Sequence, residues 1–351
     1  MKIDRIELQP GYSISRIIKG GWHLAGGHGA VDEQQAIEDM RAFVEAGVTT
    51  FDCADIYTGV EELIGKFIRQ NKDAFTAGDL SSVQIHTKYV PDGDALSTLT
   101  KAETVGIIDR SLQRLGVERL DLVHFAWWDY AIPGYVETAL HLTDLQKEGK
   151  IQYIGVTNFD GVHLKELLQA GVPVVANQVQ YSILDHRVER DLQELAEEYE
   201  IGYLCYGVVA GGFLSDRYLD STEPVEPLEN RSLVKYRLII DEFGGFTRFQ
   251  EVLQTLRAIA DKHNASIAEV ATRYILQKYM VAGVIVGARN LDHLSSLKNM
   301  SLFSLDSDDL QTISEIIVGA RDPSGPVFGL EREKEGKHGK IMRYNLNKQR
   351  V

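Results

Sequence analysis

At 351 residues the chain is longer than one ordinary domain, but it lies within the range of a single α/β barrel, which takes roughly 250 residues before insertions. Hydrophobic residues make up 44% of the sequence and charged residues 25%, as in soluble globular proteins with a large core. The formal charge of −14 argues against nucleic acid or an anionic membrane as a partner, because both are bound through clustered lysine and arginine.

The sequence gives no sign of secretion or membrane insertion. Residues 1–17 lack an apolar core of signal-peptide length, and no apolar run approaches the roughly 18 residues of a membrane span. Two cysteines, Cys53 and Cys205, are too few for a disulfide framework and fit a reducing compartment. We therefore expect a cytoplasmic protein whose two thiols are buried.

Short apolar runs rich in valine and isoleucine alternate with segments of helical period, a pattern typical of βαβ units. The runs predict eight strands, at residues 16–21, 49–52, 83–88, 120–125, 153–158, 174–180, 201–206 and 282–287. No G-x-G-x-x-G motif follows the first strand, where an open dinucleotide-binding sheet would need it. The pattern therefore predicts a closed (β/α)8 TIM barrel, in a single domain that spans residues 1–351.

Two segments extend this barrel. Residues 211–246, after the seventh strand, contain proline and glycine, and we expect them to form a long loop that acts as a lid over one end of the barrel. The tail, from about residue 320 to residue 351, is polar with little helical period. We expect this tail to be partly ordered.

Polar residues stand at the ends of two neighbouring predicted strands. Asp52 ends the second strand, Tyr57 lies on the loop that follows, and Lys88 ends the third strand. A phenol, with an ordinary pKa near ~10, becomes a usable proton donor at neutral pH when a cation stabilises its phenolate. Lys88 would be that cation, and Asp52 would hold it charged and oriented. Taken singly, each residue also has a structural interpretation, as an ion pair or as a packed tyrosine.

Several motifs in their order along the chain resemble those of the aldo-keto reductases: FDCADIYTGVEELIG, HTK, LDLVHFAWWDY, IGVTNFD, NQVQYSIL, CYGVVAGGFL and VIVGAR. The resemblance covers residues 14 to 320, and AWWDY is similar to the HWWDY motif of one branch. It implies a barrel that binds NADP(H) across the strand ends and transfers hydride to the carbonyl of a small molecule. Tyr57 would then be the general acid, tuned by Lys88 and Asp52.

The same resemblance implies a set of cofactor-binding residues. Thr157, Asn158 and Gln178 would bind the nicotinamide carboxamide, and Tyr206 would stack on the ring. The guanidinium of Arg289 would meet the 2′-phosphate, which favours NADPH over NADH. Gly21 and Gly287 belong to the same cofactor-binding set.

The largest departure from the family pattern falls at Ala126, where the resemblance places a catalytic histidine. His124 faces the same barrel interior but lies roughly 6.6 Å deeper, because residues two apart on a strand point the same way. It is a candidate catalytic residue only through an intervening water, and a structural interior histidine is the alternative. With Trp22, Trp127 and Trp128 near the predicted mouth, Ala126 suggests a wide apolar substrate pocket.

Three functions follow from these observations. The first is an NADPH-dependent oxidoreductase that reduces the carbonyl of a bulky or aromatic small molecule. The second is a non-redox isomerase, dehydratase or cyclase that uses the Tyr57–Lys88 pair or a Schiff base at Lys88. The third is a redox-inactive regulatory protein that binds NADPH. None of them needs a metal, and we predict no metal site.

Overall fold

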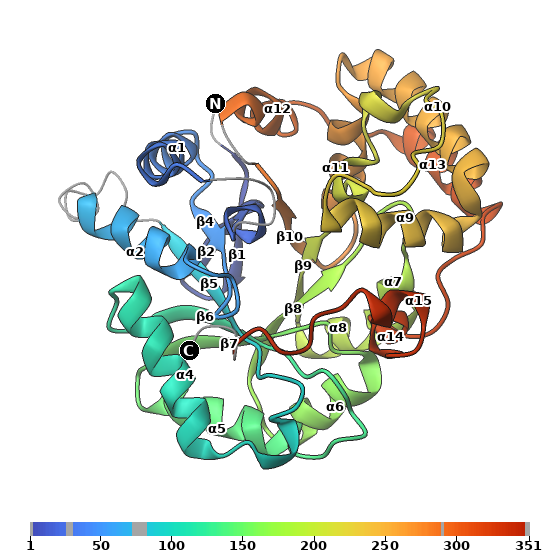
Figure 1. Ribbon diagram of the computed structural model, residues 1–351. Coiled ribbons are helices and arrows are strands. Elements are labelled where there is room, and N and C mark those ends of the chain that lie inside the picture. The colour runs from blue at the N-terminus through green and yellow to red at the C-terminus, as the bar shows by residue number, and fades with distance from the viewer. Residues whose placement is uncertain (1–2, 26–30, 72–82, 289–290, 348–351) are drawn as a thin grey trace.

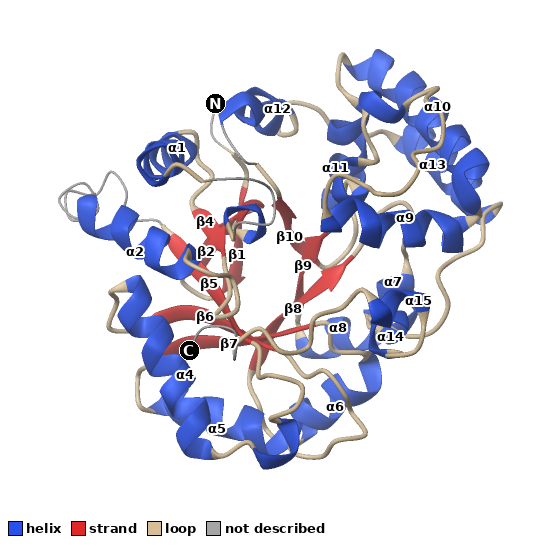
Figure 2. Cartoon of the chain, viewed as in Figure 1, coloured by secondary structure: helices blue, strands red, loops and turns tan. Residues whose placement is uncertain are grey.

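The computed structural model describes residues 3–25, 31–71, 83–288 and 291–347. At its centre eight parallel strands form a closed barrel, and helices surround it on the outside (Figures 1 and 2). The predicted (β/α)8 barrel is confirmed, with strand boundaries within two residues of those expected. Around the barrel the strands are β3 (Ile17–Gly20), β4 (Thr50–Asp52), β5 (Gln84–Tyr89), β6 (Leu120–Phe125), β7 (Ile151–Thr157), β8 (Val174–Gln180), β9 (Gly202–Tyr206) and β10 (Val281–Val286), which pairs with β3.

The helices alternate with these strands and bury one face each against the barrel. Local signals fix their ends: α4 begins with a capping box between Thr100 and Glu103 and ends at Gly116, which has a left-handed φ of 70°. The helices packed around the barrel are α1 (Glu33–Glu45), α2 (Val60–Gln70), α4 (Lys101–Leu115), α5 (Tyr135–Lys147), α6 (Gly161–Gln169), α7 (Arg187–Asp191), α8 (Gln193–Tyr199), α10 (Gly245–His263), α11 (Ile267–Leu276), α12 (Leu294–Asn299) and α13 (Ser307–Val318).

An N-terminal hairpin, which the sequence pattern did not predict, closes one end of the barrel. Strands β1 (Arg5–Gln9) and β2 (Tyr12–Ser15) pair antiparallel, joined by a turn at Gly11. From this hairpin Leu8, Tyr12 and Ile14 pack with Ile18 of β3 and other side chains of the barrel interior. Because the N-terminal ends of the barrel strands are plugged in this way, the interior opens only toward their carboxyl ends, which is where (β/α)8 enzymes carry their active sites.

The expectation that residues 211–246 form a loop needs correction, because about a third of the segment is helix. After the short turns η3 (Ala210–Gly212) and η4 (Asp216–Tyr218), helix α9 (Arg231–Phe243) begins with the side chain of Asn230 accepting from the amide of Leu233. Its buried residues Leu233, Tyr236 and Ile240 recur at helical spacing. This period is visible in the sequence, and it identifies a helix that the prolines and glycines of the segment obscured.

The C-terminal tail packs across the barrel opening, as the red trace of Figure 1 shows. It contains the short helices α14 (Gly329–Arg332) and α15 (Lys337–Lys340). Arg332 donates hydrogen bonds to the carbonyl of Trp127 after β6, at 3.2 Å, and to that of Asn158 after β7, at 2.8 Å. Farther along, the amides of Leu346 and Asn347 donate to Asp92, which follows β5. The tail is therefore tied to the ends of three consecutive strands.

A buried ion-pair network anchors this tail. The guanidinium of Arg187 donates to both oxygens of Asp185 and of Glu331, and the Arg187 Nη1 to Glu331 Oε2 distance is 3.0 Å. The Arg187 and Glu331 side chains are at most 1% exposed. Burial would raise the pKa of Glu331, but Arg187 and Lys235 reverse that effect and lower the pKa to about 2.

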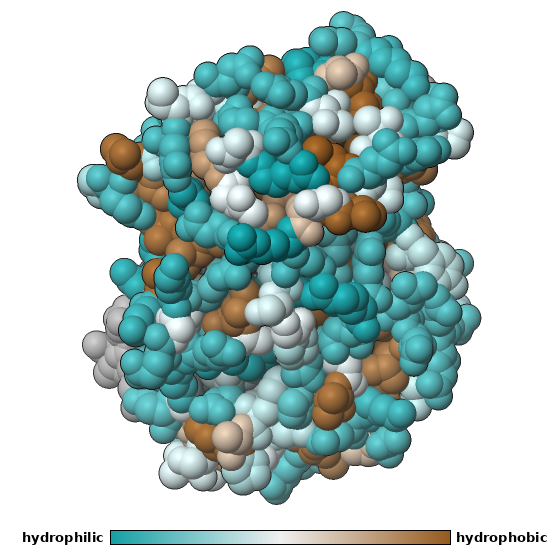
Figure 3. Space-filling model, turned by 90° about the vertical axis from the view of Figure 1, so that its right-hand side faces the viewer, coloured by the Kyte–Doolittle hydropathy of each residue, from teal (hydrophilic) through white to brown (hydrophobic). Residues whose placement is uncertain are grey.

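The described residues include no helix that is long and apolar enough to cross a membrane. Figure 3 shows the face that carries α10 and α13 as mainly hydrophilic, with hydrophobic side chains in small separate groups.

We predict that Glu331→Ala releases the tail from the barrel. Removing one partner of a buried ion pair costs about 3–5 kcal/mol, so trypsin should cleave after Lys334 or Lys337 at least about tenfold faster than in the wild type. Glu335→Ala, at an exposed position of the same segment, is the control. The contribution of Glu331 should be complete above its ordinary pKa of 4.5 and be lost as the pH falls toward 2. Equal cleavage of both variants would contradict this anchoring role.

Candidate active site

The carboxyl ends of β4 and β5 hold a buried ion pair. Lys88 Nζ donates to the two carboxylate oxygens of Asp52, both at 2.7 Å, and to the carbonyl of Cys53 at 2.8 Å. Only 6% of the Lys88 side chain and 5% of the Asp52 side chain is exposed. Gln178 Nε2, from β8 on the other side of the barrel, donates to Asp52 Oδ1 at 2.7 Å. The carboxylate therefore bridges two sides of the barrel interior.

The charge of Lys88 is maintained by these neighbours. Burial by itself would lower the pKa of Lys88, but the negative charge of Asp52 outweighs it, with a further contribution from Tyr57, and the net pKa is raised. The ammonium group is therefore protonated at neutral pH.

Tyr57 lies directly beside this ammonium group. A tight turn after β4, in which the amide of Tyr57 donates to the carbonyl of Ala54 at 3.0 Å, brings the ring back over the barrel mouth. Lys88 Nζ is 5.0 Å from the centroid of the Tyr57 ring. Burial raises the pKa of the Tyr57 phenol, the positive charge of Lys88 offsets part of this effect, and the net pKa is raised. The structure thus brings together the three residues that the sequence pattern selected.

Gly21 allows the first barrel strand to approach this group. The amide of Gly21 donates to the carbonyl of Asp52 at 2.8 Å. A Cβ atom at this position would lie 2.8 Å from that carbonyl oxygen and 2.9 Å from Cγ1 of Val60, which is closer than real Cβ contacts allow. The next residue, Trp22, is 37% exposed and packs edge-on against the Tyr57 ring, with centroids 5.1 Å apart. One wall of the mouth is therefore aromatic.

The expected nicotinamide-binding residues lie together at the ends of β7, β8 and β9. Asn158 has a left-handed φ of 61°, a conformation that asparagine tolerates better than most residues, and its Oδ1 accepts from the hydroxyl of Tyr206 at 2.7 Å. The hydroxyl of Thr157 donates to the carbonyl of Gln178 at 3.1 Å. Gly287 is exposed just beyond β10, whereas Arg289 lies outside the described residues.

The polar atoms left over at these positions fit a nicotinamide carboxamide. Among the described hydrogen bonds, none uses Nδ2 of Asn158 or Oε1 of Gln178. These atoms are a donor for the carbonyl of a carboxamide and an acceptor for its amino group. Tyr206 adds a flat ring beside them. The donor set is therefore chemically suited to the cofactor that the sequence implied.

His124 has a structural environment. It is fully buried, and its Nδ1 lies 3.1 Å from the carbonyl oxygen of Val156. Burial lowers the pKa of His124, and the positive charge of Lys88 adds to this effect. The same two causes lower the pKa of the neighbouring His86 to about 3. Nε2 of His124 and Nδ1 of His86 have no hydrogen-bond partner within the described part of the chain. Both imidazoles are neutral side chains of a deep interior layer.

The three tryptophans differ in their environments, and Trp127 departs from the expectation. Its side chain is 2% exposed, packs against Phe125 and Tyr135, and donates to the carbonyls of Asp129 and Ile132. It belongs to the core, since it is buried among aromatic rings and its indole N–H is already paired with two carbonyls. Trp128 is partly buried and packs edge-on against Tyr344 of the tail. Trp22 is the tryptophan that borders Tyr57.

Sequence reasoning also missed residues at the mouth. Lys235 of α9 lies over the ring of Tyr206, and the rings of Tyr236 of α9 and Phe328 of the tail lie around Lys235. The helical period of α9 could have indicated Tyr236 as an inward residue, but no local signal places Phe328 there.

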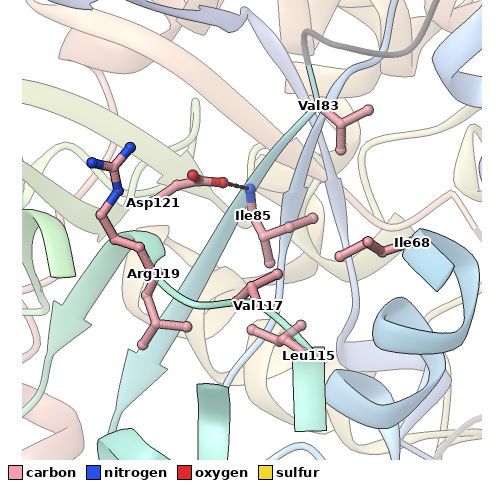
Figure 4. A pocket seen from close by; sticks show the side chains of 8 residues that line it. Ile68, Val83, Ile85, Leu115, Val117, Arg119 and Asp121 are labelled. Atoms are coloured by element: carbon pink, nitrogen blue, oxygen red, sulfur yellow. Dashed lines mark hydrogen bonds between the residues drawn. The ribbon is translucent and has the colours of Figure 1, made fainter. Parts of the chain in front are cut away.

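The hollow in Figure 4 lies at the other end of the barrel. Ile85 and Asp121, which are joined there by a hydrogen bond of 2.7 Å, stand at the beginnings of β5 and β6 together with Leu120. The other lining residues precede these strands or come from α2 and the end of α4. It is therefore separate from the group around Lys88.

The fold and this site define a (β/α)8-barrel enzyme with a buried Asp–Lys–Tyr group at its mouth, and the comparisons agree. Residues 16–318 match the model of the Aldo/keto reductase family. Aldo-keto reductase YhdN of Bacillus subtilis (strain 168) is 28% identical over 330 residues, which cover 91% of this chain and 95% of that protein.

Two solved structures share the fold. The glycerol dehydrogenase AKR11B4 from Gluconobacter oxydans superposes with a TM-score of 0.76 at 22% identity, covering 93% of this chain and 99% of that one. For the aldo-keto reductase AKR11C1 from Bacillus halodurans (holo form) the TM-score is 0.70 at 24% identity, and the superposition covers 94% of this chain and 100% of that one. The chain belongs to the aldo/keto reductase family, and it is an NAD(P)-dependent oxidoreductase that acts on carbonyl compounds.

We predict that neither interior histidine titrates during turnover. Because burial lowers the pKa of His86 to about 3 and that of His124 as well, kcat/KM for an aldehyde should show no limb near pH 6.5. In Ala126→His the new imidazole stands at the mouth, so a limb should appear between about pH 5.5 and 7.5. Profiles measured from pH 5 to 8 check this, and a histidine-like limb in the wild type would contradict it.

Proposed function

We propose that this protein reduces the carbonyl of a bulky or aromatic small molecule with NADPH, and that Tyr57 donates the proton. The observation that carries the proposal is the buried Lys88–Asp52 pair against the Tyr57 ring. The nicotinamide, when bound, supplies the hydride. Asn158 and Gln178 would hold its carboxamide, and Tyr206 would lie against its ring.

The residues of the chain then share the proton chemistry. The Tyr57 hydroxyl gives its proton to the carbonyl oxygen, and the ammonium of Lys88 stabilises the phenolate that remains. Asp52 keeps Lys88 charged and fixes its direction, and Gln178 fixes Asp52 in turn. At position 126, where the family pattern has a histidine, this chain has the methyl group of Ala126. Compared with a site that carries the histidine, the substrate carbonyl is then oriented by one polar contact fewer, and the substrate has more room.

A Schiff base at Lys88 receives no support from this geometry. Schiff-base lysines need a neutral amine, which a lowered pKa provides. The pKa of Lys88 is raised, and its three protons already have three acceptors, two on Asp52 and one on Cys53. Proton transfer through Tyr57 is the chemistry that this arrangement favours.

We predict that Tyr57→Phe lowers kcat for carbonyl reduction by about 10²–10⁴-fold, because the general acid is lost. Its Kd for NADPH, measured by quenching of tryptophan fluorescence, should change by less than about threefold, because the ring remains in place. Tyr279→Phe, at an exposed tyrosine, serves as the control. Full activity of Tyr57→Phe would exclude Tyr57 as the proton donor.

The preference for NADPH rests on Arg289. We expect Arg289→Ala to raise the Kd for NADPH at least about tenfold, because a guanidinium–phosphate contact is lost, and to change the Kd for NADH little. Arg110→Ala, at an exposed position on α4, is the matched control. If both Kd values rise together in Arg289→Ala, the assignment of Arg289 to the 2′-phosphate is wrong.

A further inference from the structure

Helix α9 carries a lysine into the wall of the barrel mouth. Lys235 Nζ lies 4.9 Å from the centroid of the Tyr206 ring, 5.6 Å from that of Tyr236 and 5.5 Å from that of Phe328. The side chain is 17% exposed. An ammonium group is therefore held among three aromatic rings, beside the residue expected to stack on nicotinamide.

Within the described residues, this ammonium group makes no hydrogen bond. Its nearest carboxylate oxygen in the described chain is Oε1 of Glu331, at 3.9 Å, and both oxygens of Glu331 already accept from Arg187. An ammonium has three donors, and the faces of aromatic rings attract its charge without accepting these protons as an oxygen would. Burial is the largest influence on Lys235 and lowers its pKa, in contrast to Lys88. Lys88 donates its protons to the carboxylate oxygens of Asp52, whereas the described residues place no oxygen within hydrogen-bond distance of Lys235.

Lys235 lies next to the expected nicotinamide-binding residues. Tyr206, under its ammonium, ends β9 and is hydrogen-bonded to Asn158. The following helix residue, Tyr236, presses so closely on the end of β9 that a Cβ at Gly207 would lie 2.2 Å from its hydroxyl. Burial raises the pKa of Tyr236, and the negative charges of Glu331 and Asp185 add to this effect. This segment of α9 therefore packs against the end of β9, beside the ring that is expected to stack on nicotinamide.

We propose that Lys235 binds an anionic oxygen group of the substrate, so that the enzyme prefers carbonyl compounds that also carry a carboxylate or phosphate. The aromatic rings around Lys235 would receive the apolar body that separates this anion from the carbonyl. This inference rests on the proposed function, the reduction of a substrate carbonyl. Phosphates of the cofactor share the same chemistry, so the test separates the two sources.

The test compares 4-carboxybenzaldehyde with benzaldehyde, which have the same ring and differ in the carboxylate. We expect the wild type to favour the charged aldehyde in kcat/KM. In Lys235→Met the ratio of the two values should fall about 10- to 100-fold, as for the loss of a charge-assisted hydrogen bond. Lys278→Met is the matched control: Lys278 also lies over a tyrosine ring, at 4.5 Å from that of Tyr274, but it is paired with Glu189 away from the mouth.

Two further measurements keep the result unambiguous. The Kd for NADPH distinguishes the sources of the anion: a tenfold or greater rise in Lys235→Met with an unchanged aldehyde ratio would assign Lys235 to a cofactor phosphate and overturn the proposal.

Benzoate should raise the melting temperature of the wild type but not of Lys235→Met or Lys235→Gln. If the wild type reduces no aldehyde, the proposed function fails, and the benzoate shift still decides whether Lys235 binds an anion. Equal benzoate shifts in all three proteins would overturn the proposal for Lys235.

Discussion

The buried contact between Lys88 and Asp52 is the interaction on which the site depends. Both charges lie in the barrel interior, where an unpaired ion would cost several kcal/mol, so each requires the other. The register of the strands brings them together: Asp52 is opposite His86 on β5, and Lys88 is opposite His124 on β6. Gly21 lets β3 approach Asp52, and Gln178 fixes its carboxylate from across the barrel. Tyr57 then has a charged neighbour that opposes the effect of burial on its pKa, as the proposed role of Tyr57 as proton donor requires.

The rest of the mouth is built by segments far from the barrel strands in sequence. The tail reaches the ends of β5, β6 and β7, and the Arg187–Glu331 pair holds it there. From α9 come Lys235 and Tyr236. Loops and added segments carry specificity on this fold, while the strands carry the common chemistry. We propose that Lys235, a buried cation among aromatic rings beside the Asp–Lys–Tyr group, is what distinguishes the substrates of this protein.

Much of this architecture could be predicted from the sequence, because its signals are local. The eight strands are apolar runs separated by helical periods, and the proposed catalytic residues Asp52, Tyr57 and Lys88 follow from their positions at or just after strand ends. The hairpin of β1 and β2 was missed because its strands are short and rich in polar residues, with burial that depends on the barrel that they plug. The sequence pattern predicted Trp127 at the mouth, because no local signal shows that the backbone carbonyls of Asp129 and Ile132 accept its indole N–H. The pairing of Glu331 with Arg187, 144 residues apart, has no local signal at all.

Because position 126 is an alanine and not the histidine of the family pattern, we propose that the proton comes from the Asp–Lys–Tyr group. His124 does not replace that histidine, since it is neutral and hydrogen-bonded in a deeper layer. The carboxylate of Asp52 should then influence catalysis only through Tyr57. A double-mutant cycle of Asp52→Asn and Tyr57→Phe on kcat/KM for an aldehyde tests this dependence directly. We expect Asp52→Asn to lower kcat/KM by at least about tenfold in the wild-type background and to have almost no effect in the Tyr57→Phe background. Additive losses in the double variant would contradict it.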